Sequence, residues 1–300
     1  MDFHPSMFDE IKDEIDLYEQ EPKKYLSIWR HRYEPLVFDI LKSRYGPPLR
    51  SFWKGYTVPM CSDKAIVLVE RRCHPNLWFT IYNAAYFCRG WSIYLFCSRQ
   101  NYQYCVDILG HNAANVHLSV QFDGVASPEQ GVREYNELLK TYDFWSQIDA
   151  ETICTMETDC YLRKPIPEEY LEYDFVGTPW AWDLDGPGGT GLTLRKKNMM
   201  IITCLRGDKD IPMQDNFASE AVKRVGGRWL PAIPCGVFLF SESTYCEDPV
   251  GVHQWWTFAF NKFLDGEGFD IVRNYFTLEV ESDEHDKSNA DHTDPDANHA

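Results

Sequence analysis

The stretch Thr152-Ile-Cys-Thr-Met-Glu-Thr-Asp-Cys160 decides how the rest of the chain is interpreted. Its first half is apolar enough for a buried strand, and its second half contains two carboxylates, Glu157 and Asp159. Alternate side chains of an extended backbone share a face, so these two carboxylates face one way and Thr158 faces the other. A divalent cation that prefers oxygen ligands, Mg²⁺ or Mn²⁺, removes the repulsion between them. On spacing alone, a pair of solvated acids in a turn is the commoner explanation.

Strand patterns and helix patterns alternate along the chain around this stretch. Apolar runs predict buried strands at residues 64–70, 91–97, 116–120 and 152–156, with helices at 76–87, 102–109 and 131–144. Such alternation is typical of an α/β fold, in which helices cover both faces of a mostly parallel sheet. Ligands of open α/β sheets bind beyond the carboxyl ends of the strands, and Glu157 and Asp159 stand at such an end.

The two ends of the chain differ in composition from the middle. Residues 1–57 have apolar side chains at helical spacings, and we expect helices that pack on the main domain, interrupted at Pro35 and at Gly46-Pro-Pro48. No catalytic residue is predicted there. Residues 58–280 are predicted to form a single catalytic domain. Residues 281–300 are acidic and have almost nothing apolar to bury, which predicts a disordered tail.

Charge and cysteine content limit the partners and the compartment. The net charge is −17, which argues against a nucleic-acid partner, because phosphate backbones are held by clusters of Lys and Arg. No signal peptide and no run long enough for a membrane span are visible. The ten cysteines include no Cys-x-x-Cys pair, so we expect reduced thiols, no zinc site and a cytoplasmic location.

Three later features are ambiguous when each is taken alone. The stretch Gly186-Pro-Gly-Gly-Thr-Gly191 matches the dinucleotide-binding pattern formally, but an alternating strand pattern follows it instead of a helix. Its glycines are expected to let the backbone approach a sugar or another strand. Asp215 begins a predicted helix, where it either caps the helix or faces the site. His253 matters only if the fold brings it to Glu157 and Asp159.

Taken in order, five motifs resemble those of a known family. They are Glu70-x-Arg72 after the first strand, Glu157-Thr-Asp159, Gly188-Gly-x-Gly-Leu-x-Leu-Arg195, Gln214-Asp-x-Phe217 and Gly251-Val-His-Gln-Trp255. The ordered set, over residues 60–262, is similar to a family of glycosyltransferases of the nucleotide-diphospho-sugar transferase (GT-A) fold, catalogued mainly as a domain of unknown function. The resemblance implies a GT-A-like, Rossmann-type domain with a mixed, mostly parallel sheet flanked by helices.

The resemblance also implies an activity and a set of site residues. A sugar passes from a nucleotide-diphosphate sugar to a hydroxyl of a glycan, protein or small-molecule acceptor. Glu157, Asp159 and His253 would hold Mn²⁺ or Mg²⁺ against the donor diphosphate, and Asp215 would act as the catalytic base. The donor-binding residues that we assign are Glu70, Arg72, Thr158, Gly189 and Arg195. Four tryptophans are candidates for stacking on a sugar: Trp180, Trp182, Trp255 and Trp256.

Two other functions stay open at this point. A nucleotidyltransferase could share the fold and the metal, but it usually needs an early basic loop for a triphosphate, and only Arg71 and Arg72 are present. A non-catalytic sugar- or nucleotide-binding module would keep the pocket and could lose the base, and Asp215 argues against this alternative.

Overall fold

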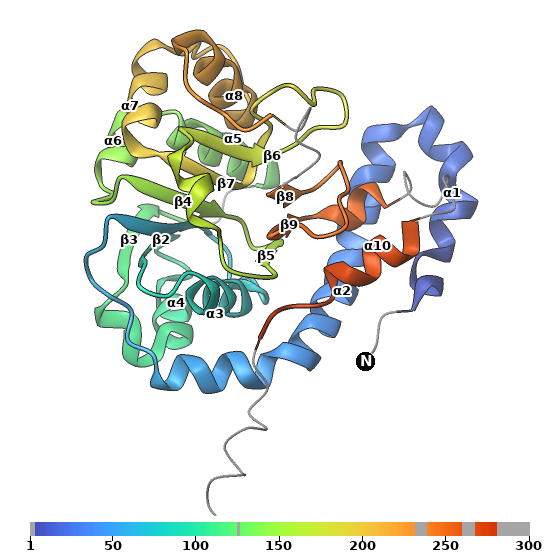
Figure 1. Cartoon of the computed structure of the whole chain (residues 1–300), viewed down its shortest axis with the longest axis horizontal. Coiled ribbons are helices and arrows are strands. Elements are labelled where there is room, and N and C mark those ends of the chain that lie inside the picture. The colour runs from blue at the N-terminus through green and yellow to red at the C-terminus, as the bar shows by residue number, and fades with distance from the viewer. Residues whose placement is uncertain (1–3, 125–126, 232–238, 260–267, 281–300) are drawn as a thin grey trace, which may run out of the picture.

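A six-stranded sheet forms the centre of the protein (Figure 1). The structure, a computed structural model, describes residues 4–124, 127–231, 239–259 and 268–280. The sheet has the order β3-β2-β1-β4-β7-β6. Its strands are β1 (Lys64–Val69), β2 (Ser92–Ser98), β3 (His117–Phe122), β4 (Thr152–Met156), β6 (Phe175–Thr178) and β7 (Gly189–Lys196). Strands β3, β2, β1 and β4 pair in parallel, whereas β7 is antiparallel to β4 and to β6. The predicted α/β class, with a mixed and mostly parallel sheet flanked by helices, is confirmed.

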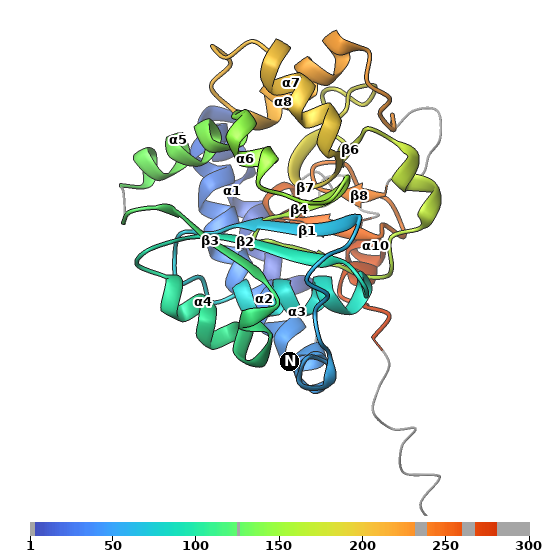
Figure 2. The ribbon, with the colours of Figure 1, turned by 90° about the vertical axis from the view of Figure 1, so that its left-hand side faces the viewer.

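Helices cover both faces of this sheet (Figure 2). The helices beside it are α3 (Leu77–Phe87), α4 (Tyr102–Leu109), α5 (Pro128–Leu139), α6 (Tyr142–Ser146), α7 (Lys197–Arg206) and α8 (Gln214–Val225). Alternate side chains of β1 enter two separate cores, as the pleat of a strand requires. Ile66 and Leu68 pack in the core that contains α3 and α4, and Ala65 and Val67 pack in the core of α5 to α8.

The regular elements up to β4 lie within a few residues of their predicted positions. One predicted helix, at residues 131–144, is two helices in the structure, α5 and α6. The break occurs at Thr141, whose hydroxyl accepts a hydrogen bond from the backbone N–H of Phe144 at 3.3 Å and so caps α6. Such a cap offers the backbone a partner that competes with a continuous helix. The predicted tail, residues 281–300, lies outside the described residues.

The amino-terminal helices are α1 (Asp9–Gln20), after the 3₁₀ turn η1 (Pro5–Phe8), and α2 (Pro22–Gly55). The prediction that prolines interrupt this region is wrong, because α2 continues through Pro35, Pro47 and Pro48. An interior proline costs a helix about 3 kcal/mol. However, α2 buries ten residues, including Trp29 and Phe38, and each large apolar side chain contributes about 1.5–3 kcal/mol when fully buried. Packing against α1, α3 and the turn η4 (Trp255–Phe258) therefore outweighs the loss of backbone hydrogen bonds.

A second, smaller sheet has the order β5-β9-β8 and lies between the main sheet and α2 (Figure 1). Its strands are β5 (Cys160–Leu162), β8 (Phe240–Ser241) and β9 (Gly251–His253). The remaining elements are η2 (Gly110–Ala114), η3 (Glu168–Glu172) and α10 (Gly268–Tyr275). Strand β5 directly follows the Glu157-Thr-Asp159 motif and is antiparallel to β9. Among the helices of the described part of the chain, none combines the length and the apolar character needed to cross a membrane.

Candidate functional site

The two central strands of the main sheet end in acidic residues at the point where the strand order reverses. From β1 the chain proceeds outward to β2 and β3, and it then returns to the other side of β1 as β4. Ligands of open α/β sheets bind at such a switch point, outside the carboxyl ends of the strands. Glu70 follows β1, and Glu157 follows β4. Leu68 and Met156 are paired in the sheet, so the carboxyl ends of the two strands lie side by side. The hydroxyl of Thr158 donates to Oε2 of Glu70 at 3.3 Å and so ties the two ends together.

Glu157, Asp159 and His253 lie together at this point. Nε2 of His253 is 3.3 Å from Oδ1 of Asp159 and 3.9 Å from Oε2 of Glu157. The small sheet produces this arrangement, because its register pairs Cys160 with His253. The backbone N–H of Gln254 also donates to the carbonyl of Asp159 at 3.1 Å. Residues 158 and 159 lie in a turn rather than in the extended backbone expected from the sequence, and both carboxylates lie near His253.

Gly191 of β7 provides the space that the ring of His253 occupies. A Cβ atom at this position would lie 2.3–2.7 Å from three atoms of the imidazole. The carbonyl of Gly191 also accepts from the backbone N–H of Glu157 at 2.9 Å, so β7 borders the site directly. Of the two roles expected for the glycine-rich stretch, approach to another strand is the one that this contact shows.

Replacement of Gly191 by Ala is expected to weaken Mn²⁺ binding by ~10–100-fold, the range found when metal-ligand positioning is lost. The added methyl group must displace the imidazole of His253 from Glu157 and Asp159. Titration of the Mn²⁺ electron paramagnetic resonance signal measures the affinity. Gly55→Ala is the matched control, because a Cβ atom at Gly55 meets nothing within 4 Å. An unchanged affinity in Gly191→Ala would remove His253 from the proposed ligand set.

Glu242 is a fourth member of the cluster that the sequence analysis missed. It directly follows β8, and its Oε2 lies 3.4 Å from Nδ1 of His253. Its carboxylate also accepts hydrogen bonds from the hydroxyl of Thr178 and from Nε2 of Gln254. A carboxylate behind a metal-binding histidine fixes the orientation of its ring. The available signal was an acid two residues after an apolar run, residues 237–240, similar to the signal that identified Glu157.

The charges of the cluster favour a cation at its centre. Burial lowers the pKa of His253, but the carboxylates of Glu242 and Asp159 outweigh burial and hold this pKa well above its ordinary value. Burial raises the pKa of Asp159, but Arg30 and His253 hold it well below its usual range. Burial, together with the charge of Asp159, raises the pKa of Glu157. Either a proton on His253 or a metal ion among these side chains supplies the positive charge.

The arrangement of ligand atoms fits a hard divalent cation. Oδ1 of Asp159 and both ring nitrogens of His253 are buried, and in the described part of the chain none has a hydrogen-bond partner. Neighbouring ligands of an octahedral ion with bonds of about 2.1 Å lie about 3 Å apart, close to the 3.3 Å between Asp159 and His253. Cys160 also lies near these atoms, but burial and the charges of Asp159 and Glu157 keep its pKa well above the ordinary value. Its Sγ donates to the carbonyl of Gly191, so it is not a ligand for a hard ion.

Arg30 of α2 is a second residue that the sequence analysis missed. Its Nη2 donates to Oδ2 of Asp159 at 2.6 Å, and the charge of Asp159 raises the pKa of Arg30 further above its ordinary value. No local pattern distinguishes Arg30 from the other basic residues of α2. The contact joins residues 129 positions apart, so only the tertiary fold reveals it.

Asp215 lies in the first turn of α8 but does not cap it. The residue at the cap position is Met213, and no side chain donates or accepts there. Asp215 is half-buried, and its Oδ1 accepts from the N–H of Asn216 at 3.0 Å. Burial raises its pKa, and the charge of Glu242 raises it further, which places Asp215 within electrostatic reach of the cluster.

The residues assigned to the donor divide into two groups. Glu70 is buried and accepts from the backbone and guanidinium of Arg72, whose side chain is 65 % exposed. Gly189 packs against protein atoms, since a Cβ there would lie 2.7 Å from Oγ1 of Thr178. Arg195 is also enclosed in protein, with its guanidinium over the rings of Trp145 and Phe175, and burial lowers its pKa to about 10. The structure therefore corrects the assignment of Gly189 and Arg195, whose contacts are with the core rather than a ligand space.

The four candidate tryptophans differ in their exposure to solvent. Trp255 and Trp256 are fully buried, so the expectation that they stack on a sugar is wrong. Trp182 is 69 % exposed and stacks on Trp180, with ring centroids 5.8 Å apart. The loop that carries this pair is joined to the cluster through Ser243, whose hydroxyl accepts from the N–H of Ala181.

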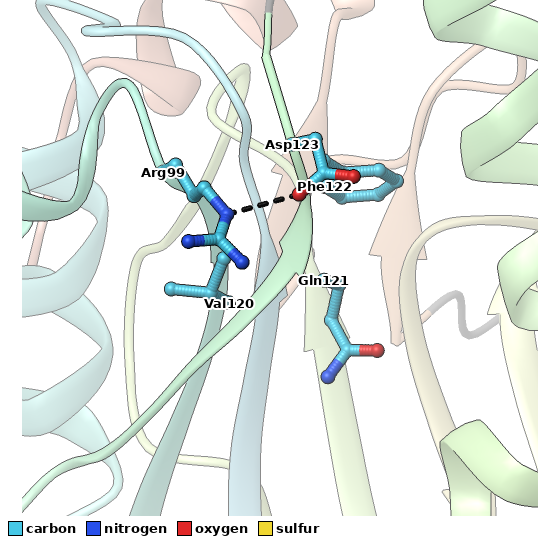
Figure 3. A pocket seen from close by; sticks show the side chains of 5 residues that line it. All are labelled: Arg99, Val120, Gln121, Phe122 and Asp123. Carbon is cyan, nitrogen blue, oxygen red and sulfur yellow. Dashed lines mark hydrogen bonds and ion pairs between the residues drawn. The ribbon is translucent and has the colours of Figure 1, made fainter.

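Two hollows lie near the carboxyl end of β3 in the main sheet. The smaller, of about 240 Å³, is lined by Arg99, Val120, Gln121, Phe122 and Asp123 (Figure 3). The side chains of its ion pair, Arg99 and Asp123, are both highly exposed, so the pair contributes little to stability. The larger, of about 620 Å³, is lined by Arg71 and by residues of α5. The same helix α5 contacts the cluster at a residue that does not line the hollow, Tyr135, whose hydroxyl donates to Oε1 of Glu157 at 2.8 Å.

The comparisons with known proteins give a match to one family model over part of the chain and no activity. Comparison with curated proteins finds no match for the chain. The stretch that does match a family model starts after β3 and includes Glu157, Asp159, Asp215 and His253. The predicted relation to a family catalogued as a domain of unknown function is confirmed at that level: residues 124–261 match the family described as Protein of unknown function (DUF5672).

Proposed function

We propose that the protein is a metal-dependent glycosyltransferase that moves a sugar from a nucleotide-diphosphate sugar to an acceptor hydroxyl. One observation supports this most strongly. Glu157, Asp159 and His253 meet at the switch point of the sheet, and Oδ1 of Asp159 and both ring nitrogens of His253 are buried without a hydrogen-bond partner among the described residues. Two carboxylates and an imidazole suit Mn²⁺, and Mg²⁺ is the second choice because it prefers oxygen alone.

The chemistry requires stabilisation of the leaving group. As the bond from the anomeric carbon to the diphosphate oxygen breaks, the electron pair stays on the diphosphate and its negative charge grows. A bound divalent cation supplies positive charge at this place, where little water is present to do so. Glu157, Asp159 and His253 would hold the cation. Glu242 lies at ion-pair distance from the other ring nitrogen of His253, and the hydroxyl of Tyr135 holds the carboxylate of Glu157.

The larger hollow offers room for the nucleoside. Arg71 lines it, and this residue lies between Glu70 and Arg72 in the chain, after the carboxyl end of β1. The exposed guanidinium of Arg72 is held by the buried carboxylate of Glu70, which fixes its direction. Thr158 contacts the same carboxylate, so the donor-side residues and the metal ligands form one connected network.

Asp215 is the proposed base toward the acceptor. The acceptor oxygen forms a bond to the anomeric carbon and loses its proton, which a carboxylate within hydrogen-bond reach accepts. The raised pKa of Asp215 makes it a stronger base than a solvated aspartate. The exposed ring of Trp182, which stacks on the buried Trp180, offers an aromatic face on which an acceptor sugar could stack.

We further propose that the protein acts in the cytoplasm and has no nucleic-acid partner. None of the nine cysteines in the described part of the chain forms a disulfide, as expected in a reducing compartment. The net charge of −17 disfavours contact with a phosphate backbone. The acceptor class, whether glycan, protein or small molecule, is left to experiment.

A panel of nucleotides and nucleotide-sugars tests the proposed function. In the presence of Mn²⁺, one nucleoside diphosphate is expected to raise the melting temperature, and the matching nucleotide-sugar should be hydrolysed slowly without an acceptor. Removal of the metal with a chelator should abolish both effects. A shift with a nucleoside triphosphate instead would favour a nucleotidyltransferase, and a shift without turnover of any donor would favour a binding module.

A further inference from the structure

Arg30 and a metal ion can be present at the site together. Arg30 bonds Oδ2 of Asp159 at 2.6 Å, whereas Oδ1 of the same carboxylate faces His253 at 3.3 Å. The two oxygens therefore have separate partners. Oδ1 remains available to a cation while Oδ2 stays with Arg30, and hydrogen bonding of a ligating carboxylate is the usual way to fix its direction.

The guanidinium of Arg30 has N–H donors that Asp159 does not use. It offers five N–H donors, and among the described residues only Asp159 accepts from them. The side chain of Arg30 is 40 % exposed, although that of its partner Asp159 is only 4 % exposed. The backbone beneath it is held firmly, because the buried indole of Trp256 donates to the carbonyl of Arg30 at 3.2 Å.

The charge at the site calls for a second cation beside the metal. Glu157, Asp159 and Glu242 lie around His253, and a divalent ion compensates only part of their charge when they are ionised. An incoming diphosphate adds more negative charge. Arg30 is the only arginine or lysine that forms an ion pair with this cluster among the described residues.

We infer that Arg30 binds the diphosphate of the donor next to the metal and stabilises the charge of the departing nucleoside diphosphate. The inference rests on the proposed function and adds a residue that lies outside the family match. A guanidinium suits this role because its planar donors bond phosphate oxygens in pairs, and charged hydrogen bonds of this kind are short and strong. Helix α2 is then part of the catalytic site.

The test measures Mn²⁺ binding and pyrophosphate binding separately on the full chain. Mn²⁺ affinity is followed by electron paramagnetic resonance, and the Mn²⁺ complex of inorganic pyrophosphate is titrated calorimetrically into the Mn²⁺-loaded protein. Arg30→Gln is expected to keep Mn²⁺ binding and to weaken pyrophosphate by ~10–100-fold, the effect of losing one or two charged hydrogen bonds. Arg30→Lys keeps the charge but loses the planar fork, so an intermediate loss is expected.

Arg32→Gln is the matched control. Arg32 lies on the same helix but pairs with Glu14 of α1, with both hydrogen bonds at 2.9 Å, away from the cluster. It should bind pyrophosphate like the wild type. Equal pyrophosphate affinity in the wild type and both Arg30 variants would overturn the inference while leaving the metal site intact.

Failure of the proposed function gives a different result. A wild-type protein that binds no Mn²⁺ overturns the metal-dependent mechanism, and metal-free pyrophosphate then decides the role of Arg30. Loss of that binding in Arg30→Gln supports the role, and equal or absent binding overturns it. If Arg30→Gln does not fold, because Asp159 is left without its partner, Arg30→Lys serves for the same comparison.

Discussion

Asp159→Asn is expected to abolish Mn²⁺ binding and, with it, the metal-dependent affinity for the donor. Asp159 offers Oδ1 toward His253 and is held by Arg30 through Oδ2, so it occupies the centre of the proposed ligand set. An amide has no negative charge to offer the cation. We expect Mn²⁺ affinity to fall by more than ~100-fold, beyond the 10–100-fold that loss of a supporting residue costs. Titration of the Mn²⁺ electron paramagnetic resonance signal measures the metal affinity, and the rise in melting temperature with a nucleoside diphosphate measures donor-side binding.

A matched control lies at the opposite end of the same strand. Asp149 is exposed and precedes β4, so Asp149→Asn makes the same chemical change away from the cluster. It should bind Mn²⁺ and nucleotide like the wild type. Some loss of stability is expected in Asp159→Asn even without metal, because Arg30 and His253 hold the pKa of this carboxyl well below its usual range. Full Mn²⁺ affinity in Asp159→Asn would exclude the metal site proposed here.

The second large effect concerns Asp215 and the transfer step. Asp215→Asn is expected to lower the rate of transfer by ~10²–10⁴-fold, the range typical for loss of a general base. Donor binding should remain, since the residues that would hold the metal belong to β9 and to the segment after β4. The two readouts are the nucleotide-induced thermal shift, expected to persist, and the rate of sugar transfer to an acceptor.

The control for Asp215 lies on the same helix. Glu220 is exposed on α8, and Glu220→Gln should retain both donor binding and transfer. If Asp215→Asn loses the thermal shift as well, Asp215 supports the structure of the site rather than acting as the base. If transfer survives at the wild-type rate, direct displacement with this base is wrong, and a mechanism that retains the anomeric configuration becomes the better hypothesis.

The sequence was sufficient for the features that depend on local pattern. The apolar runs at β1, β2 and β4 predicted buried strands because a parallel sheet covered on both faces leaves no polar side to the strand. The position of Glu157 and Asp159 beyond β4 followed from the same pattern. Local pattern failed at α2, where proline is a helix breaker by propensity but the burial of ten residues outweighs it.

The rest of the site depends on contacts between distant segments. Arg30 reaches Asp159 from a helix 129 residues earlier, and no property of its neighbours along the chain marks it. The meeting of His253 with Asp159 requires the register of β5 against β9, two strands of three residues each, too short for a reliable pattern. Arg195 was assigned to the donor from its place in a motif, whereas its side chain enters a core lined by Trp145 and Phe175.

The boundaries of the family match have a consequence for any attempt to study that stretch alone. A fragment that starts at residue 124 lacks β1, β2 and β3. Strand β4 would then lose its parallel neighbour and become an unpaired edge, although all five of its residues are buried in the whole protein. Exposed apolar edges recruit strands from other molecules, so such a fragment is prone to aggregate. A soluble fragment would therefore have to include β1, residues 64–69, which lies outside the matched residues.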